Sequence, residues 1–264
     1  MAINPITAKQ YTDSVDIVTD GSIVEEEEEN YSAAFCPDPN ELITEDDAPV
    51  DNFPSAKQQR LLVGSLYSAL PNVRFLAEAN VGVYYQSGVP AIVPDVFVSF
   101  DVEVPENWWD KPNRCYLVWN FGKPPEIALE IVSNQVGNEL SQKLEIYERM
   151  RASYYVLYDP AHKLSEKTLR VFELRARHYT ELSEHWMEQV QLGLTLWEGA
   201  FEGRLDTWLR WCDKEGTVLL TGDEKAERES QRAEQESQRA EQESQRADRL
   251  AALLKEQGID ISDI

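Results

Sequence analysis

Two carboxylates stand inside apolar segments of the sequence, and they are the residues that point most directly to chemistry. Asp95 follows Pro94 at the head of an apolar run, and Glu130 interrupts the run Ile127–Val132. Burying a charged carboxylate in such a place is costly unless something pairs with it. Two such acids indicate a bound cation, because Mg²⁺ is commonly held by one or two carboxylates together with water and substrate phosphate. An ion held in this way polarises a phosphate and activates water.

A lysine and a tyrosine lie where they could join this carboxylate pair. Lys143 comes thirteen residues after Glu130, and Tyr147 follows one helical turn later on the same helix face. The lysine could stabilise charge that develops on a phosphate, while the tyrosine positions the lysine or the water. A structural interpretation stays open, in which Asp95 marks a strand end and Lys143 pairs with Glu139 at i and i+4.

Several common catalytic classes lack their motifs. The twelve glycines form neither the phosphate-binding loop G-x-x-x-x-G-K-S/T nor G-x-G-x-x-G, which excludes nucleotide-driven motors. No G-x-S-x-G elbow occurs, so the commonest class of serine hydrolase is excluded as well. Three histidines fit no H-E-x-x-H pattern and are expected to be surface or packing residues: His162, His178 and His185.

Hydrophobic periodicity predicts a mixed α/β body. Helices are expected over residues 53–70 and 137–151, where apolar residues recur at helical spacing. The run 127–132 indicates a central strand buried on both faces. Further strands are expected as a meander at 73–77, 81–85 and 93–100, then at 115–119 and 154–158, and as a hairpin at 169–174 and 179–182, with a short helix at 205–212.

The net charge of −23 over 264 residues is concentrated at the N-terminal end. Residues 1–51 hold 14 acids and one base, so this segment carries −13. Residues 52–215 and residues 216–264 carry −5 each. Nucleic-acid binding depends on Lys and Arg that contact phosphates, which a strongly acidic chain disfavours. Because the central segment is only mildly acidic, nucleic acid is not excluded as a partner.

The first 51 residues form an acidic arm without a sustained hydrophobic period. It contains the run Glu25–Glu29, and blocks of like charge usually form solvated tails. We therefore expect a disordered, solubilising arm. A second interpretation is that the arm lies across a basic substrate groove, mimics phosphate and inhibits the protein.

Residues 216–264 form a charged tail with a seven-residue repeat. The sequence ESQRAEQ at Glu229–Gln235 recurs letter for letter at Glu236–Gln242. Seven is the coiled-coil period, but one alanine per repeat makes a seam too thin to bury much. A solvated helix ending near Gly258 is the first expectation, and a homodimer through this tail stays open. The chain is thus expected to divide into the arm 1–51, a body 52–215 and the tail 216–264.

The sequence also indicates where the protein works. No run of about 18 apolar residues occurs, and no apolar block follows a basic N-terminus, so neither a membrane span nor a signal peptide is expected. A cytoplasmic location follows. The three cysteines are scattered without a C-x-x-C pair, which argues against both disulfides and a cysteine zinc site: Cys36, Cys115 and Cys212.

Several strings, in this order and spacing, resemble the Uma-two family of bacterial restriction endonucleases, within the PD-(D/E)XK nuclease superfamily. The strings are VPDVFV at 93–98, PEIALEIVS at 125–133, Lys143 with Tyr147, YYVLYDP at 154–160, GLTLWEG at 193–199, WLRWC at 208–212 and GID at 258–260. The resemblance covers roughly residues 52–264 and leaves the acidic arm outside.

The resemblance implies a restriction-endonuclease-like core, a small mixed α/β sheet flanked by helices, with the charged helix appended at the C-terminus. It implies that Asp95 is the first metal-binding acid, that Glu130 is the second, and that the backbone carbonyl of Ile131 is a further ligand. The metal would be Mg²⁺, with Mn²⁺ as a substitute.

One position departs from the superfamily pattern. Val132 stands where the superfamily lysine usually lies, two residues after Glu130. In this family the lysine comes from the following helix, which makes Lys143 the candidate, with Tyr147 beside it.

Two functions are therefore expected from the sequence. The first is a Mg²⁺-dependent endonuclease that hydrolyses nucleic acid, in the first place DNA, through metal-activated water. The second is a catalytically silent protein of the same fold that binds a partner or oligomerises through its helical tail.

Overall fold

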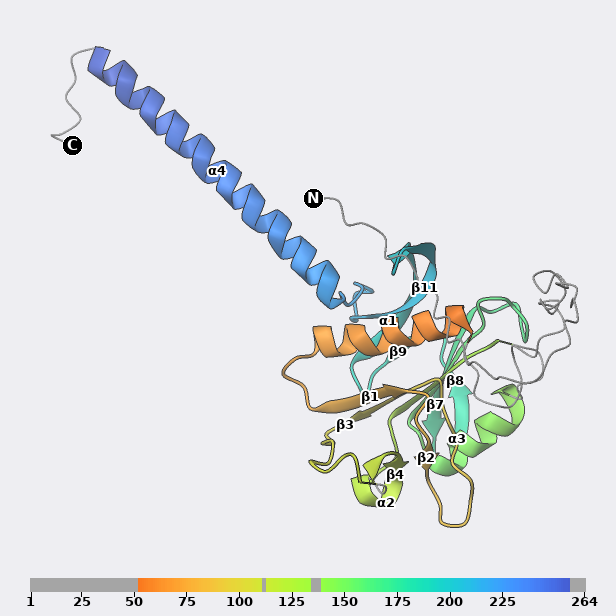
Figure 1. Ribbon diagram of the computed structural model, residues 1–264. Helices are drawn as coiled ribbons and strands as arrows, with labels where there is room; N and C mark the ends of the chain where they lie inside the picture. Colours follow the sequence, from red (N-terminus) through yellow and green to blue (C-terminus); the bar gives the residue numbers. More distant parts are fainter. Residues whose placement is uncertain (1–51, 111–112, 134–138, 257–264) are drawn as a thin grey trace, which may run out of the picture. The chain divides into compact units, whose positions relative to one another are not determined.

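Figure 1 shows a computed structural model of the chain, which describes residues 52–110, 113–133 and 139–256. At its centre lies a sheet made of six strands: β1 (Phe75–Ala79), β3 (Val96–Phe100), β5 (Ile127–Ile131), β6 (Tyr154–Tyr158), β7 (Leu169–Arg175) and β8 (His178–Glu181). The strands lie side by side in the order β1-β3-β5-β6-β7-β8. Strands β5 and β6 are parallel, and the other neighbours in this sheet are antiparallel. The mixed α/β class is confirmed.

Two smaller sheets and five helical segments complete the described part. A three-stranded sheet contains β9 (Trp186–Met187), β10 (Leu192–Phe201) and β11 (Arg204–Cys212), and a parallel pair joins β2 (Val83–Tyr84) to β4 (Tyr116–Leu117). The helical segments are α1 (Phe53–Ala69), α2 (Val118–Phe121), the π-helical turn η2 (Glu139–Lys143), α3 (Leu144–Met150) and α4 (Gly222–Glu256).

Strand β5 is the central strand that the apolar run predicts. All five of its residues are buried, between β3 on one edge and β6 on the other. Since side chains alternate along a strand, Ile127 and Leu129 face one layer while Ala128 and Glu130 face the other. The chain therefore buries one carboxylate in the middle of its central sheet.

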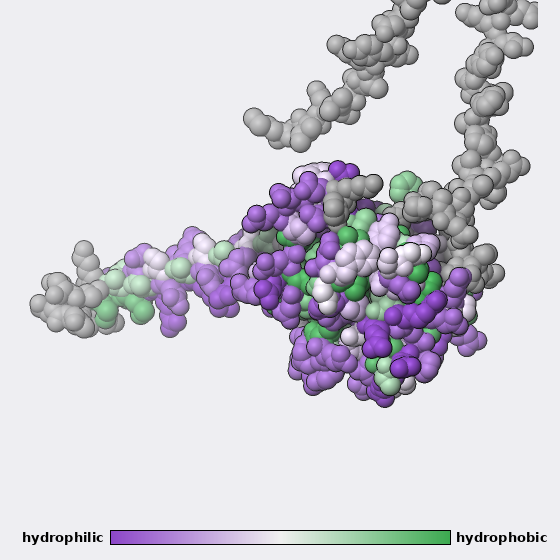
Figure 2. All heavy atoms as spheres, turned by 90° about the horizontal axis from the view of Figure 1, so that it is seen from below, coloured by the Kyte–Doolittle hydropathy of each residue, from purple (hydrophilic) through white to green (hydrophobic). Residues whose placement is uncertain are grey.

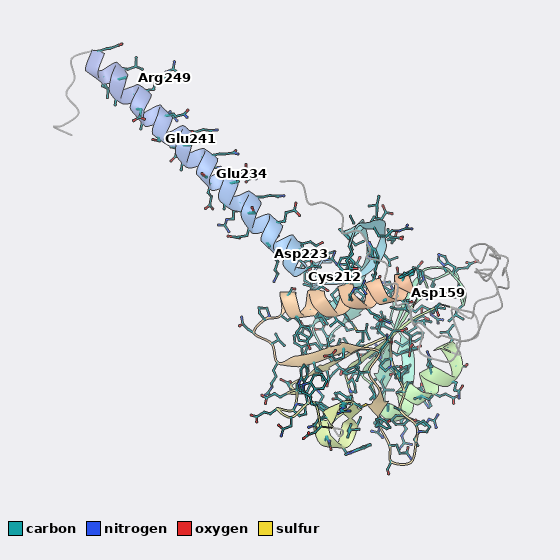
Figure 3. The ribbon with its side chains drawn as sticks, viewed as in Figure 1. Asp159, Cys212, Asp223, Glu234, Glu241 and Arg249 are labelled. Carbon is teal, nitrogen blue, oxygen red and sulfur yellow. The ribbon has the colours of Figure 1, made fainter. Side chains whose placement is uncertain are left out.

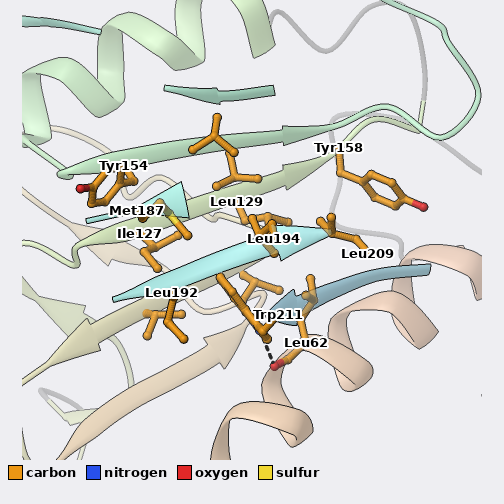
Figure 4. Close-up of a cluster of buried hydrophobic side chains, with 14 of the residues drawn as sticks. Leu62, Ile127, Leu129, Tyr154, Tyr158, Met187, Leu192, Leu194, Leu209 and Trp211 are labelled. Carbon is orange, nitrogen blue, oxygen red and sulfur yellow. Dashed lines mark hydrogen bonds between the residues drawn. The ribbon is translucent and has the colours of Figure 1, made fainter. Parts of the chain in front are cut away.

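Helix α1 and the β10–β11 hairpin cover the first face of the sheet. Leu62 of α1 packs with Leu129 of β5 and with Leu194 and Trp211 of the hairpin in one buried cluster (Figure 4). The indole Nε1 of Trp211 donates to the Leu62 carbonyl at 2.9 Å. The N-terminus of α1 is capped by Asn52, whose Oδ1 accepts from Ser55 N at 2.9 Å, which satisfies one of the free amides of the first turn.

Helix α3 covers the second face. Tyr147 and Met150 of α3 pack in one cluster with Phe97, Val132 and Tyr155 from the sheet. The ring of Tyr147 stacks on that of Tyr155 at a centroid distance of 5.0 Å, so α3 is held directly over β5 and β6. This is the face toward which Glu130 points.

Two sequence predictions of secondary structure are wrong. The expected meander does not form, because β1 pairs directly with β3, while β2 between them leaves the sheet and pairs with β4. Residues 205–212 are not a helix but belong to strand β11, which pairs along its length with β10. A tight turn with positive φ at Glu202 and Gly203 joins the two strands, and hairpin pairing overrides the local helical spacing.

The strand expected at 115–119 forms only in part, because β4 ends at Leu117 and α2 begins at Val118. Other expected elements are present. The hairpin expected at 169–174 and 179–182 forms as β7 and β8. The helix expected at 137–151 is present from Glu139, and its first turn is π-helical rather than α-helical. The acidic arm 1–51, Cys36 and the helix stop at Gly258 lie outside the described residues.

Helix α4 is the charged helix that the repeats predict. It runs for 35 residues, and its surface is largely hydrophilic (Figure 2), with Glu234, Glu241 and Arg249 along it in Figure 3. Two leucines near its C-terminal end, Leu250 and Leu253, are exposed. Within residues 52–110, 113–133 and 139–256, no helix is both long enough and apolar enough to cross a membrane.

A buried ion pair joins the start of α4 to the hairpin. Arg210 of β11 is 1% exposed, and its Nη2 donates to Glu224 Oε2 at 2.7 Å and to the Leu219 carbonyl at 2.8 Å. Its guanidinium also lies 4.8 Å from the centre of the Trp197 ring. Despite the opposing effect of burial, hydrogen bonds from Arg210 lower the pKa of Glu224 below its ordinary value.

We expect Glu224→Gln to lower the free energy of unfolding at pH 7 by about 1 to 3 kcal/mol, because it leaves the Arg210 charge buried without a counter-ion. Because the pKa of Glu224 is lowered in the folded state, its carboxylate stabilises the folded protein at pH values above the ordinary carboxyl pKa. This contribution is lost as the pH falls through the folded-state pKa. Urea unfolding should therefore show a smaller difference between wild type and variant near pH 4 than at pH 7. The exposed Glu229→Gln is the matched control, and a difference independent of pH would contradict the account.

Candidate active site

The fold brings Asp95 and Glu130 together across the pair β3–β5. The antiparallel register pairs Val96 with Leu129, and its continuation by one residue places Asp95 opposite Glu130. Both side chains belong to the face covered by α3, since positions 95 and 97 share a face, as do 128 and 130. Cross-strand neighbours of this kind have their Cβ atoms about 5 Å apart. The two carboxylates that the sequence singled out are thus neighbours in space.

Asp95 extends the hydrogen-bond ladder beyond the end of β3. Its Oδ2 accepts from the backbone N of Ile131 at 2.6 Å, where a backbone carbonyl of a longer β3 would otherwise lie. Its Oδ1 accepts from Nε2 of Gln59 at 3.2 Å, and the Oε1 of Gln59 accepts in turn from Nδ2 of Asn80 at 3.1 Å. The Asp95 side chain is therefore held by a strand, a helix and a loop.

Glu130 receives two donors from the layer above the sheet. Tyr147 OH donates to its Oε1 at 2.5 Å, and Lys143 Nζ donates to its Oε2 at 3.0 Å. Glu130 is 2% exposed and Tyr147 is fully buried, whereas about a third of the Lys143 side chain remains exposed. Lys143 ends the π-helical turn η2, a type of turn that often occurs at functional sites.

Burial and the neighbouring carboxylate disfavour the charged form of Glu130. Burial and the adjacent Asp95 raise the pKa of Glu130 to about 8, although Lys143 and Tyr147 act in the opposite direction. Burial and the Glu130 charge raise the pKa of Tyr147 well above its ordinary value, so the phenol stays protonated and donates. The contacts from Lys143 and Tyr147 therefore do not fully offset the effect of burial and of Asp95 on Glu130.

Two further positions named from the sequence lie at the same place. The backbone N–H of Ile131 points to Asp95, and since the N–H and C=O of one strand residue face the same edge, its carbonyl faces Asp95 too. Val132 is 2% exposed and packs among apolar side chains of the α3 layer. Lys143, entering from η2, supplies the ammonium at Glu130 that a lysine at position 132 would otherwise bring.

The donor set fits a hard divalent cation. Asp95 and Glu130 supply adjacent carboxylate oxygens, which Mg²⁺ prefers and which it typically completes with water and phosphate. Among the described residues, no three His, Cys, Asp or Glu side chains gather into a ready-made metal cage. The arrangement therefore suits a magnesium site that relies on water and substrate more than a structural zinc site.

Sequence reasoning missed Gln59 and Asn80. Gln59 is 3% exposed and lies 36 residues before Asp95, so its contact with that carboxylate is purely tertiary. A signal existed, because Gln58 and Gln59 precede Leu62 and Leu66 on the buried side of α1, where uncharged polar residues need partners. The side-chain amide of Gln58 hydrogen-bonds the backbone of Leu209 in β11, whereas that of Gln59 hydrogen-bonds Asp95.

Comparison with known proteins identifies the family. The Uma2 family, described as "Putative restriction endonuclease", matches residues 20–201. The chain belongs to the Uma2 family, and its mixed sheet with flanking helices is consistent with a restriction-endonuclease-like fold. The match begins inside the acidic arm and ends before β11, whereas the sequence resemblance was placed at residues 52–264. A search of curated proteins finds no match.

We expect Tyr147→Phe to lower the free energy of unfolding by about 1 to 3 kcal/mol, because the buried Glu130 Oε1 loses its donor. Urea unfolding without added metal measures this change. Tyr84→Phe is the matched control, since the hydroxyl of that half-exposed tyrosine makes no hydrogen bond within the described residues. Equal effects of the two variants would show that the Tyr147 hydroxyl does not stabilise Glu130.

Proposed function

We propose that the protein is a Mg²⁺-dependent endonuclease that hydrolyses phosphodiester bonds of nucleic acid at Asp95 and Glu130. The observation that carries the proposal is the cross-strand placement of these carboxylates, with Lys143 Nζ 3.0 Å from Glu130. Membership of the Uma2 family supports the same reaction class. An acid pair with an adjacent lysine is a set of groups suited to metal-assisted hydrolysis.

The carboxylates of Asp95 and Glu130 would hold the metal, together with the carbonyl of Ile131, and Mn²⁺ would substitute for Mg²⁺. When bound, the ion supplies polarisation of the phosphate and a water of lowered pKa. Gln59 and the Ile131 amide keep Asp95 oriented toward β5, so its position does not depend on the metal. Such fixed geometry reduces the reorganisation that the reaction requires.

Lys143 would stabilise the negative charge that grows on the phosphate. Its ammonium is bound to Glu130 on one side and remains partly exposed, so a substrate entering from solvent can reach it. Tyr147 is buried and bound to Glu130, which makes it a positioning residue for that carboxylate. The sequence assigned the tyrosine to position the lysine or the water, whereas its hydroxyl is bound to Glu130.

DNA is the proposed substrate, and the proposed organisation is an acidic arm over residues 1–51, a nuclease body over residues 52–215 and a helical tail over residues 216–264. Much of the net charge of −23 lies in the arm, which leaves the body only mildly acidic. Deleting residues 1–51 raises DNA affinity at matched salt if the arm masks the site, and leaves it unchanged if the arm only solubilises.

We expect Glu130→Gln to reduce cleavage of a DNA substrate by at least about a thousandfold in the presence of Mg²⁺, because the amide carries no charge with which to hold the ion. Gel analysis of end-labelled single- and double-stranded DNA measures the rate, with RNA tested in parallel. The matched control is Glu145→Gln, an exposed carboxylate on α3.

Circular dichroism and the urea midpoint verify that the Glu130→Gln protein is folded. Wild-type cleavage rates in a folded Glu130→Gln protein would contradict the proposal. Equal losses in Glu130→Gln and Glu145→Gln would show that the effect is not specific to the site.

A second candidate function rests on α4. The helix presents 35 residues, mostly polar or charged, and exposes Leu250 and Leu253 near its end, which suits pairing with a partner helix or with a second copy of the chain. A silent nuclease fold would then serve as the carrier of this helix. A truncation after Arg228 keeps the Arg210–Glu224 pair and removes the rest of α4. Sedimentation then measures association, and its loss in the truncated protein supports a helix-mediated assembly.

A further inference from the structure

A cavity opens on the face of the sheet that α3 also covers. It encloses about 420 Å³, and aromatic rings form much of its wall, with Phe97 and Tyr116 inside and Trp108 and Trp109 at the rim. Both rim tryptophans are strongly exposed, at 56% and 76%. This volume lies within the range of sites that bind small molecules or single bases. We call it the tryptophan pocket.

The flat rings are arranged to receive another flat ring. Tyr116 stacks on Phe121 at 4.2 Å with an angle of 7°, and Phe97 meets Tyr116 edge-on at 5.2 Å. Trp108 and Trp109 lie at 69° to each other, so both present ring surface to solvent. In Figure 1, α2 and β4 lie at the lower edge, the side that Figure 2 shows, where apolar side chains gather among hydrophilic ones.

One carboxylate lines this aromatic pocket and has no hydrogen-bond or ion-pair partner among the described residues. Glu78 of β1 is half-buried, and no donor or basic side chain among the described residues binds its oxygens. Burial alone raises the pKa of Glu78. An acceptor-only group in such a wall is suited to a ligand that brings hydrogen-bond donors.

A basic group stands at the same rim. Arg114 lines the pocket and is exposed, and its Nε donates to the Trp109 carbonyl at 2.8 Å. No carboxylate of the described residues pairs with its guanidinium. Arginine with free donors is well suited to phosphate.

The tryptophan pocket and the carboxylate pair are connected through strand β3. Glu78 is the cross-strand partner of Phe97, and Phe97 is two residues from Asp95 on the same strand face. Two residues of strand span roughly 7 Å. A nucleic acid with a phosphate at Asp95 and Glu130 therefore has an adjacent nucleotide within reach of the tryptophan pocket.

We propose that the tryptophan pocket binds an unpaired guanine base of the nucleic-acid substrate, an inference that rests on the proposed function. The tryptophans stack on the base, as aromatic side chains do on unpaired bases. The Watson–Crick edge of guanine places two donors, N1–H and N2–H, side by side, and the two oxygens of Glu78 accept both. Arg114 contacts the adjoining phosphate.

Fluorescence anisotropy of labelled oligonucleotides tests this directly. The full chain is kept in EDTA, which withholds the metal, and is titrated against oligothymidylate carrying one central guanine, hypoxanthine or adenine, with an oligouridylate series as the RNA arm. We expect guanine to bind about tenfold more tightly than hypoxanthine, which lacks the N2 amino group. A guanine preference in either arm supports the proposal.

Variants identify the residues responsible. Glu78→Gln should shift the preference from guanine to adenine, because an amide offers one donor and one acceptor. Trp108→Ala and Trp109→Ala should each weaken guanine binding about tenfold. Trp119→Ala is the matched control, an exposed tryptophan outside the pocket that should leave affinity unchanged.

Equal affinity for all three bases in both arms, or wild-type affinity in Trp108→Ala and Trp109→Ala, would overturn the pocket proposal. The outcome is separable from that of the nuclease proposal. Cleavage without base preference would refute only the pocket, and guanine-specific binding without cleavage would refute only the nuclease.

Discussion

The carboxylate of Glu130, buried in the middle strand of the central sheet, is the constraint on which the site depends. A strand interior offers a carboxylate no water, so its charge must be matched by donors or by a cation. The chain places Tyr147 and Lys143 above it and Asp95 beside it. Tyr147 and Lys143 supply donors, and Asp95 adds a second carboxylate, which is the arrangement from which we propose a cation site.

The rest of the fold holds that arrangement in place. Stacking of Tyr147 on Tyr155 fixes α3 over the sheet, and the π-helical turn before α3 carries Lys143 to Glu130. From the opposite layer, α1 sends Gln59 to Asp95, while the β10–β11 hairpin covers the remaining face. Both layers thus contribute to one site, and the buried leucines and tryptophans that pack them set its geometry.

The sequence was sufficient to predict an element or a site residue where a local pattern reflects the final environment. The apolar run of β5 predicted a strand buried on both faces, and a carboxylate within it stood out because charge is rare there. The seven-residue repeat likewise predicted α4, since charged residues at helical spacing need no tertiary partner. Asp95 could be named for the same reason as Glu130, although only the register of β3 with β5 brings the two together.

The sequence was insufficient where a distant segment decides the outcome. Leu205, Trp208, Leu209 and Cys212 have helical spacing, yet the turn at Glu202 and Gly203 folds them back as β11 against β10. Strand β2 leaves the expected meander because β4 offers it a parallel partner 33 residues later. Gln59 and Asn80 act on Asp95 only through a tertiary hydrogen-bond chain, which no local pattern records.

Calorimetric titration of Mg²⁺ and Mn²⁺ into wild type and Glu130→Gln is the most direct test of the central claim, that Asp95 and Glu130 form a cation site. Each titration is done with the full chain, alone and then with an oligonucleotide present. The account predicts saturable binding to one site in the wild type and none in the folded variant. Equal binding in both proteins, or none in the wild type under either condition, would contradict it.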